Sequence, residues 1–450
     1  MKIIIIGNGI SGITAARWIR KLSNHNVLVI SEESEYFYSR TALMYIYMGH
    51  MRFEDTKPYE DWFWEKNKIA LRKARVTHIE TENRLLFISG GETIPYDKLI
   101  LATGSVSNKM GWPGQDLEGV TGLYGLQDLE KMEKFSKNLK RAVIVGGGLI
   151  GIEMAEMFHS RNIPVTMLVR ESQYWDNVLP MEEASMISKH IMAHHIDLRL
   201  GVNLDSVIGD DQGNVVAVKV KESGEKISCG FVGLTPGVSP NLALIKNTSI
   251  EFQKGILVND FLETNIPGIY AIGDCAQIRS PKPGRTPVEA VWYTGKMMGE
   301  TIAHTLCVKP TVYNPGIWFN SAKFFDIEYQ VYGDVPNHLP EHLDCIFWQH
   351  PNGQKSIRIV YTSKNHTVAG FNLLGIRYRH EVCEKWLKNK TTLEEVLPNL
   401  ALANFDPEFS QQYEKEIVNI YNHKYRRNVT LEKNRSLKHV FRFLEKKEGR

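Results

Sequence analysis

The chain begins with the run Lys2-Ile-Ile-Ile-Ile6, followed by Gly7-Asn-Gly9-Ile-Ser-Gly12 and Ile13-Thr-Ala-Ala-Arg17. The unbroken β-branched run predicts a strand that is buried on both faces. Glycines at this spacing allow a tight turn, close approach of the backbone to a pyrophosphate, and close packing of strand and helix. A second apolar run, Val27–Ile30, ends at Ser31-Glu32, where an acid can accept hydrogen bonds from a ribose. This order predicts a dinucleotide-binding unit.

The same pattern occurs a second time, about 140 residues later. Ala142-Val-Ile-Val is followed by Gly146-Gly-Gly148-Leu-Ile-Gly151-Ile-Glu153, and then by a second apolar strand, Val165–Val169, with Arg170 after it. Two complete fingerprints with the correct flanking elements predict two dinucleotide sites in one chain.

Composition places the chain among globular enzymes. It has 450 residues, enough for two or three domains, and a formal net charge of +3. The stretch from Lys424 to Arg450 holds ten Lys/Arg against three Glu, so the remainder is mildly acidic and the tail is basic. We expect no nucleic-acid partner.

The cysteines and the apolar runs indicate the compartment. Five cysteines are odd in number, widely spaced and form no C-x-x-C, which argues for reduced thiols in the cytoplasm and against a disulfide framework or a zinc site. We therefore predict no metal. Met1–Ile6 is too short for a signal-peptide core, and no apolar run reaches the length of a membrane span.

Several local patterns predict further elements of the N-terminal half. An amphipathic helix is expected at Tyr59–Lys66, with Trp62 in the core. Ala74–Glu80 and Arg84–Ile88 alternate like an antiparallel ribbon. The aromatic segment Tyr36–Tyr45 fits either beneath a large planar ligand or in an ordinary core helix.

From about Pro310 the pattern changes to antiparallel β-structure. Asp344–Gln349 and Ser356–Thr362 flank a Pro-Asn-Gly hairpin signal, and Thr367–Leu373 follows. Helices are expected near Arg379–Lys388 and Leu393–Leu397. Asp406-Pro407 is typical of a helix start. It predicts a helix from that point, with Phe409, Tyr413, Ile417 and Ile420 on its apolar face.

Three more motifs follow strands or form turns: Tyr96-Asp-Lys-Leu-Ile-Leu-Ala-Thr-Gly104, Pro236–Asn241 and Thr264-Asn-Ile-Pro-Gly-Ile-Tyr-Ala-Ile-Gly-Asp274. Asp274 after a buried strand is either a helix N-cap or a carboxylate that receives hydroxyls of a cofactor. With these motifs in this order, the chain resembles the FAD-dependent pyridine nucleotide–disulfide oxidoreductase superfamily. It is similar to the single-flavin ferredoxin, rubredoxin and nitrite-reductase-type NAD(P)H reductases and to coenzyme A disulfide reductases.

The resemblance implies an α/β fold with two Rossmann-like dinucleotide-binding domains and a C-terminal α+β interface domain. The FAD-binding domain would comprise residues 1–112 and 238–309. The NAD(P)H-binding domain, at 113–237, would be inserted into it. The C-terminal domain would cover 310–400, and a helical basic tail 401–450.

The resemblance also implies a set of cofactor-binding residues and, for hydride transfer from NAD(P)H to FAD, no catalytic side-chain acid or base. Expected against FAD are Gly7, Gly9, Ser11, Gly12, Glu32, Arg40, Thr41, Val76, Thr103, Gly104, Gly273, Asp274, Glu289 and Trp292. Ala102 and Gly237 are also expected to contact a cofactor. Expected against NAD(P)H are Gly146, Gly148, Leu149, Ile150, Gly151, Glu153 and Arg170.

Two departures from the family pattern bear on the second half-reaction. The redox cysteine of disulfide-reducing members aligns with Thr41, so disulfide reduction is disfavoured. Oxygenase-type ferredoxin reductases carry a lysine where this chain has Tyr45, so an ion pair with Glu153 cannot form here.

The sequence thus favours an NAD(P)H oxidoreductase that passes electrons through FAD to a small, acidic electron-carrier protein. The alternatives are a peripheral NADH:quinone reductase and an NAD(P)H-sensing interaction protein. Monomer and homodimer are both open. Val169 and Arg170 occupy the place where NADH-selective sites carry an acid, which favours NADPH, although Glu171 could restore that acid.

The basic tail contains one further pattern. Leu437, Val440, Phe441 and Leu444 follow helical spacing and predict one apolar stripe, with Lys438, Arg442 and Lys446 off it. Such a helix either packs on its own domain or docks to an acidic carrier or an anionic membrane surface, and of the two docking partners we favour the carrier.

Overall fold

The computed structural model describes residues 1–406, 408–432 and 437–445. The chain forms two compact units. The first comprises Met1–Gly146, Met154–Val165 and Leu204–Pro315, and the second comprises Gly147–Glu153, Thr166–Asn203 and Gly316–Arg450. Within the described residues, no helix combines the length and the apolar character needed to cross a bilayer.

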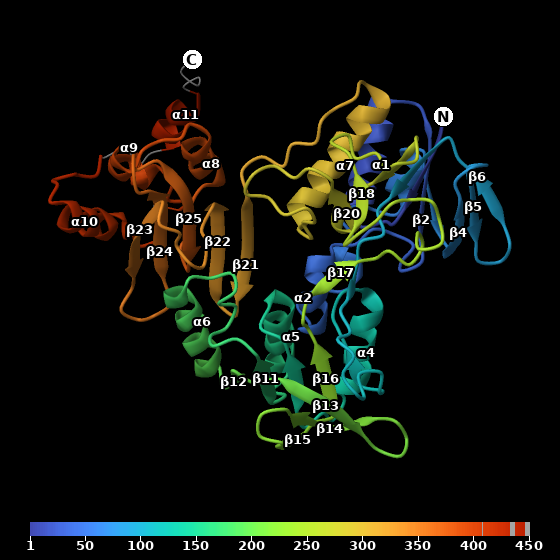
Figure 1. Cartoon of the computed structure of the whole chain (residues 1–450), viewed down its shortest axis with the longest axis horizontal. Helices are drawn as coiled ribbons and strands as arrows, with labels where there is room; N and C mark the ends of the chain where they lie inside the picture. Colours follow the sequence, from blue (N-terminus) through green and yellow to red (C-terminus); the bar gives the residue numbers. More distant parts are fainter. Residues whose placement is uncertain (407, 433–436, 446–450) are drawn as a thin grey trace. The chain divides into compact units, whose positions relative to one another are not determined.

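The first unit is built on a five-stranded parallel sheet in the order β19–β7–β1–β2–β3 (Figure 1). Its central strand carries the isoleucine run, and Ile3, Ile4 and Ile5 are fully buried because both faces of the sheet are covered. The strands are β1 (Lys2–Ile6), β2 (Asn26–Ser31), β3 (Ile69–Lys73), β7 (Lys98–Leu101) and β19 (Ile269–Ala271).

Two long helices of this unit, α1 and α7, pack against each other beside the sheet (Figure 1). Small residues allow the close approach, since a Cβ at Gly299 would lie 2.6 Å from the carbonyl oxygen of Ser11. The helices and 3-10 turns of the unit are α1 (Ile10–Leu22), η1 (Arg40–Ala42), α2 (Leu43–Tyr47), η2 (Glu54–Thr56), α3 (Trp62–Lys66), α4 (Leu126–Ser136), η3 (Gly273–Cys275) and α7 (Trp292–Cys307).

The prediction for the short helix α3 is wrong in its core residue. Trp62 is 59% exposed, whereas Trp64 is 3% exposed and packs edge-on against Tyr59 and Phe63. A helix of five residues makes little more than one turn, so periodicity cannot decide which of two nearby tryptophans faces inward.

Smaller sheets complete the first unit. The predicted antiparallel ribbon is confirmed as β4–β5–β6, and β10–β16–β9 form a second parallel set. The remaining sets are β13–β14–β15, β17–β8 and β18–β20. The strands are β4 (Val76–Glu80), β5 (Leu85–Ile88), β6 (Thr93–Pro95), β8 (Ser105–Ser107), β9 (Val120–Thr121), β10 (Ala142–Val145), β13 (Leu204–Gly209), β14 (Val215–Val220), β15 (Lys226–Ser228), β16 (Phe231–Leu234), β17 (Val238–Pro240), β18 (Ile256–Val258) and β20 (Ala276–Ile278).

The second glycine loop leads into α5 (Leu149–Ser160), and the strand predicted after it is β11 (Val165–Val169). β11 pairs in parallel with β12 (Asp197–Leu200), and α6 (Met181–Ala193) connects the two strands. A parallel pair joined by a helix is the βαβ arrangement that the fingerprint predicts.

The C-terminal part of the second unit is an antiparallel sheet in the order β21–β22–β25–β24–β23, which confirms the predicted hairpin (Figure 1). One face, with Ile357, Ile359 and Tyr361, packs into a core with the C-terminal helices. The strands are β21 (Phe319–Phe324), β22 (Ile327–Gly333), β23 (Leu343–Gln349), β24 (Ser356–Thr362) and β25 (Val368–Leu374).

The other face of this sheet is joined to α6 by a buried ion pair. Arg358 lies between Ile357 and Ile359 in sequence, and therefore points to the opposite side of the strand. Its Nε lies 2.7 Å from Glu183 Oε1, with side-chain exposures of 4% and 0%. Asn372 donates a third hydrogen bond to Glu183, and Glu182 accepts one from Arg358. α6 is thus fixed against β24 and β25.

The C-terminal helices differ from the predictions at two places. The helix expected from Asp406 begins only at Glu414, and Phe409 is 87% exposed; Pro407 lies outside the described residues. The Asp406 amide instead donates a hydrogen bond to the side-chain oxygen of Asn404, which forms a local turn in place of a helix cap. The helices are α8 (His380–Lys388), α9 (Leu393–Val396), η4 (Leu397–Leu402), α10 (Glu414–Tyr425) and α11 (Leu437–Glu445).

The predicted apolar stripe of the tail is also wrong in one residue. Val440 is 4% exposed in the core of the second unit, but Phe441 is 60% exposed. Phe443 lies inward in its place, 5.8 Å from the ring of Trp386, and its carbonyl accepts a hydrogen bond from Lys385. Helix α11 therefore packs on its own domain. Ser436 and Lys446 lie outside the described residues.

Candidate functional site

The first glycine loop turns sharply between β1 and α1. Gly7 has φ +112°, and a Cβ there would lie 2.0 Å from the carbonyl oxygen of Ala102. Gly12 is equally restricted, because its Cβ would lie 2.1 Å from the carbonyl oxygen of Gly7. At Gly9 the same construction meets nothing within 4 Å, and Gly9 is the N-cap of α1. The loop therefore presents an open helix N-terminus of the kind that binds phosphate.

Ser11 lies where the loop, α7 and the η3 turn converge. Its hydroxyl oxygen would lie 2.3 Å from a Cβ at Gly273 and 2.6 Å from one at Gly295. Gly273 has φ +72°, so any other residue there would be both strained and in collision. The structure thus brings the predicted residues Ser11 and Gly273 together.

The acid predicted for the ribose, Glu32, follows the second strand and is 62% exposed in its side chain. It pairs with Arg75 at 3.6 Å, directly before the predicted residue Val76, which begins β4. Glu32 and Val76 therefore lie where a ligand at the ends of β2 and β3 could reach them. That they bind one stays a prediction.

Glu33, the next residue, makes a more extensive set of contacts. Arg40 binds its carboxylate through both guanidinium NH groups, with Arg40 Nη2 2.6 Å from Glu33 Oε2. The Leu126 amide and the Tyr38 hydroxyl also donate to this carboxylate. Burial alone would raise the pKa of Glu33, but the Arg40 charge and the hydrogen bonds from Arg40, Tyr38 and Leu126 together outweigh burial and hold the pKa below its ordinary value. Arg40 also donates to the Tyr124 carbonyl.

Asp274 lies in the η3 turn and receives two hydroxyls. Tyr124 donates to its carboxylate at 3.3 Å and Ser105 at 3.4 Å, while the Ser105 amide donates to the Tyr124 hydroxyl at 2.8 Å. Burial raises the pKa of the Asp274 carboxyl, and the hydrogen bonds from Tyr124 and Ser105 oppose that rise. Among the described bonds, the Asp274 side chain caps no helix. That it receives cofactor hydroxyls stays a prediction.

The strand that ends in Ala102-Thr103-Gly104 is tied to the Pro236–Asn241 turn. Thr103 Oγ1 donates to the carbonyl of Asn241 at 2.9 Å, and the Asn241 amide donates to the carbonyl of Gly104 at the same distance. Gly237 has φ +109° within this turn. The structure thus places the predicted residues Thr103, Gly104 and Gly237 in one connected region.

The two residues at the start of α7 have different surroundings. Glu289 forms an ion pair with Arg285 at 2.5 Å, and both side chains are less than 10% exposed. Trp292 is 39% exposed and lies edge-on to Tyr293. Glu289 is thus bound to Arg285, whereas Trp292 is partly exposed with the Lys296 ammonium 5.8 Å from its ring centre.

Position 41 and the cysteines bear on whether this chain could reduce a disulfide in the second half-reaction. Thr41 is exposed, and its hydroxyl lies 3.1 Å from that of Ser39. All five cysteines are free, and Cys275 is fully buried with its Sγ donating to the carbonyls of Leu101 and Ile272. Burial raises the pKa of the Cys275 thiol, so this residue is a packed thiol and not a nucleophile.

The second glycine loop repeats the first in its details. Gly146 has φ +126°, and a Cβ there would lie 2.4 Å from the carbonyl oxygen of Thr235. A Cβ at Gly147 would lie 2.8 Å from Val169, and at Gly148 it would meet nothing within 4 Å. The predicted residues Leu149, Ile150, Gly151 and Glu153 form the first turns of α5.

Arg170 and Glu171 follow β11 as a pair. Arg170 Nε lies 2.7 Å from Glu171 Oε1, and the two side chains are 71% and 20% exposed. Glu171 Oε2 lies 3.6 Å from the position of a Cβ on Gly147, so the carboxylate borders the glycine loop while the guanidinium extends into solvent. Tyr174 donates to the Gly148 carbonyl at 2.6 Å and supports the same loop.

Sequence reasoning missed two residues of the first unit, Glu33 and Tyr124. Glu33 adjoins the predicted Glu32, so the two acids after the strand offered a sequence signal that fits Glu33 as well as Glu32. Tyr124 had no such signal, because its partner Asp274 lies 150 positions away. The residues present fit FAD: an open helix N-terminus for the pyrophosphate at Gly9, and a partly buried carboxylate for hydroxyls at Asp274.

Comparison with known proteins identifies the family of this chain. The family model of the pyridine nucleotide-disulphide oxidoreductases matches residues 1–298. The chain is 29% identical over 346 residues to an NADH-rubredoxin oxidoreductase from Clostridium acetobutylicum, covering 75% of this chain and 83% of that protein. It also resembles the putidaredoxin reductase–putidaredoxin complex in fold, with a TM-score of 0.76, 22% identity, and coverage of 93% and 98%.

A nitrite reductase from Bacillus subtilis is 30% identical over 282 residues, or 62% of this chain. This chain spans only 34% of that protein, and 39% of a nitrate reductase electron transfer subunit from the same organism. The predicted α/β fold with two Rossmann-like domains and a C-terminal α+β domain is confirmed, and members of the matching family bind FAD and use NAD(P)H. The chain therefore belongs to the pyridine nucleotide-disulphide oxidoreductase family.

Proposed function

We propose that this chain passes electrons from NAD(P)H through FAD to a small electron-carrier protein of the rubredoxin or ferredoxin type. The observation that carries the proposal is the residue at position 41. Disulfide reduction requires a thiol that the reduced flavin can reach, and Thr41 offers a hydroxyl instead. The name of the Clostridium relative, an NADH-rubredoxin oxidoreductase, supports a protein acceptor.

FAD, when bound, accepts a hydride from NAD(P)H and releases the electrons to an acceptor. The residues of this chain bind and orient the reactants. The N-terminus of α1 would hold the pyrophosphate, Asp274 would accept cofactor hydroxyls, and the Glu33–Arg40 pair would fix the segment before α2. No side chain needs to donate or remove a proton in the transfer of a hydride.

An acidic carrier suits the charge of the tail. Arg426, Arg427 and Arg442 are exposed, whereas Lys424 is bound to Asp344 at 2.6 Å. Exposed cations raise the rate of encounter with an acidic partner, and added salt screens this attraction. Arg426 and Arg427 would therefore contribute steering, and Lys424 would contribute to the fold of its own domain.

The experiment is anaerobic reduction followed by reoxidation. The holoprotein is reduced with NADH or with NADPH, and the return of the oxidised flavin absorbance is followed after mixing with rubredoxin, ferredoxin, a soluble quinone, coenzyme A disulfide or oxygen. We expect a carrier protein to reoxidise the flavin faster than any other acceptor. Faster reoxidation by quinone or by the disulfide would contradict the proposal, and reduction with no reoxidation by any acceptor would favour a sensor.

A pair of variants sharpens the result. Thr41→Cys supplies the missing thiol, and we expect it to leave carrier reduction within about twofold of the parent. Arg426→Ser/Arg427→Ser should slow carrier reduction at low salt, and leave reduction by NAD(P)H unchanged. If the double variant behaves like the parent at every salt concentration, the tail does not steer the carrier.

A further inference from the structure

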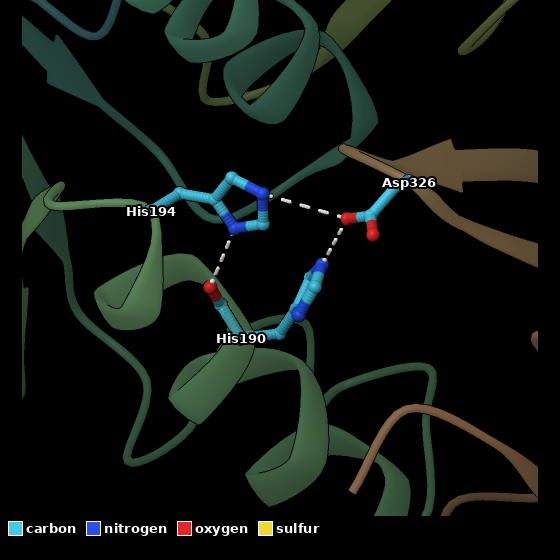
Figure 2. A group of neighbouring side chains, drawn as sticks. All are labelled: His190, His194 and Asp326. Carbon is cyan, nitrogen blue, oxygen red and sulfur yellow. Dashed lines mark hydrogen bonds and ion pairs between the residues drawn. The ribbon is translucent and has the colours of Figure 1, made fainter. Parts of the chain in front are cut away.

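Two histidines and an aspartate of the second unit converge at the end of α6 (Figure 2). His190 Nε2 lies 2.6 Å from Asp326 Oδ1, and His194 Nε2 lies 3.4 Å from the same oxygen. One ligand atom from each residue lies within 4.8 Å of the other two. The side chains are 5%, 28% and 66% exposed in the order His190, His194 and Asp326, so the cluster is closed on the helix side and open beyond the aspartate.

The two elements that carry the cluster are held rigidly. His190 and His194 are four residues apart, so they lie on one face of α6 and its C-terminal cap. Asp326 lies in the turn between β21 and β22, where Phe325 stacks on the His194 ring at 4.2 Å. The buried Arg358–Glu183 pair fixes the other end of α6 to the sheet. Three ligands held in this way lose little freedom on binding an ion.

A hydrogen bond to the backbone fixes the tautomer of His194. Its Nδ1 lies 3.0 Å from the carbonyl oxygen of His190, and a carbonyl can only accept, so Nδ1 carries the proton. In the neutral ring, Nε2 then presents a lone pair to the carboxylate oxygen. This lone pair and the carboxylate oxygen lie 3.4 Å apart, and both can bind one metal ion placed between them.

We propose that His190, His194 and Asp326 form a binding site for a zinc-class divalent transition metal. An Nδ1–H bonded to a backbone carbonyl is the arrangement that orients histidine ligands of metals. Three protein ligands would leave a fourth, tetrahedral position for water on the open side. The ion would cross-link α6 to the β21–β22 turn.

The ligand set and its spacing select the ion. Two imidazoles and one carboxylate suit zinc and its neighbours, whereas magnesium and calcium prefer oxygen ligands only. Zinc–ligand bonds of about 2.0–2.1 Å place tetrahedral ligand atoms about 3.3 Å apart. The His194–Asp326 distance of 3.4 Å meets this value, and the His190–Asp326 distance would lengthen by less than about 1 Å.

The sequence contained part of the signal. Two histidines at i and i+4 on a helix form a metal-binding pair in known motifs, but the acid comes from a turn 132 residues beyond the second histidine. Cysteine spacing alone therefore predicted no metal here.

The test is calorimetric titration of the chelator-treated holoprotein with zinc chloride, with magnesium chloride as the comparison. We expect one zinc bound per chain, with affinity reduced roughly tenfold or more in His194→Asn and in Asp326→Asn. Zinc should raise the thermal midpoint of the parent and leave that of both variants unchanged. His423→Asn removes an exposed histidine of α10 and serves as the matched control.

Each outcome decides the proposal. Both tested ligands are partly or largely exposed, so their variants should fold, and the flavin absorbance verifies that they do. Absence of saturable zinc binding would overturn the proposal. Zinc binding that keeps the parent's affinity in both variants, or that magnesium matches, would overturn it as well.

Discussion

The hydroxyl of Tyr124 donates a hydrogen bond to the carboxylate of Asp274 across 3.3 Å, although the two residues are 150 positions apart in the chain. The same hydroxyl accepts a hydrogen bond from the amide of Ser105. Tyr124 therefore links the η3 turn to the start of β8, and holds the partly buried Asp274 carboxylate in one orientation. A carboxylate held in this way is prepared to accept ligand hydroxyls without further ordering.

Asp274→Ala should weaken FAD retention. A hydrogen bond to a buried charged group contributes about 1.5–3 kcal/mol, so we expect the dissociation constant to rise about ten- to a hundredfold. Fluorescence of released FAD during dilution measures the change. Asp211→Ala, an exposed acid of the same unit, is the control, and equal retention by the two variants would remove Asp274 from the site.

Asp274→Asn should stabilise the apoprotein against thermal unfolding at neutral pH. Burial raises the pKa of Asp274, so its ionisation disfavours the folded state as the pH rises through that raised value. The apo variant should therefore melt at a higher temperature than the apo parent at pH 7. The difference should vanish below pH 3.8, the ordinary pKa of the group, and thermal scans across this range measure it.

Glu33→Gln should remove an acid-sensitive contribution to stability. The folded pKa of Glu33 is below its ordinary value of 4.5, so its contribution is complete above pH 4.5 and is lost as the pH falls through the folded value. At pH 7 we expect a loss of about 1–3 kcal/mol, because Arg40 loses a charged acceptor. Melting temperatures should converge with the parent in acid. Glu32→Gln, in an exposed pair at 3.6 Å, should change little at any pH.

Coenzyme choice should depend on the Arg170–Glu171 pair. Because Arg170 neutralises Glu171 and remains 71% exposed, we expect NADPH to be used at least as well as NADH. Arg170→Ala should lower kcat/KM for NADPH about tenfold or more and spare NADH. The same kcat/KM values for NADPH and NADH are measured in Glu171→Gln. A strong NADH preference in the parent, abolished by Glu171→Gln, would assign the ribose to the acid instead.

The tail should contribute to stability through its buried side only. Val440→Ala should cost about 1–3 kcal/mol, since Val440 is buried against the second unit, and Phe441→Ala should cost less than about 0.5 kcal/mol. Deletion of residues 424–450 should lower the melting temperature of the second unit and leave the flavin absorbance intact. Loss of FAD on deletion would show that the tail supports the first unit too.

The parts of the fold that could be predicted have strong local patterns. β1, α1 and the β23–β24 hairpin each combine a clear hydrophobic period with an unambiguous glycine or turn signal. Trp62 and Phe441 were misplaced because a short helix allows two registers that differ by one or two residues, and only the neighbouring side chains choose between them. Asp406 was misread because an aspartate before proline suits a turn as well as a helix start.

Some residues of the candidate site could likewise be predicted from local patterns, and others could not. Gly7, Gly12 and Gly146 follow from the backbone geometry of the loops, so the motif alone predicts them. The roles of Tyr124 and Asp326 depend on contacts between segments far apart in the chain. No local period reports such contacts, and they appear only when the packing is known.

The Arg358–Glu183 pair has a consequence for synthesis of the protein on the ribosome. Glu183 is made 175 residues before its partner, which at roughly 5–20 residues per second is a wait of about 10–35 seconds. A carboxylate cannot be buried alone at acceptable cost, so helix α6 cannot take its final place during that interval. We expect nascent chains that stop before β24 to expose α6 to protease, and chains that extend past Arg358 to protect it. The last quarter of the protein thus completes the folding of its middle.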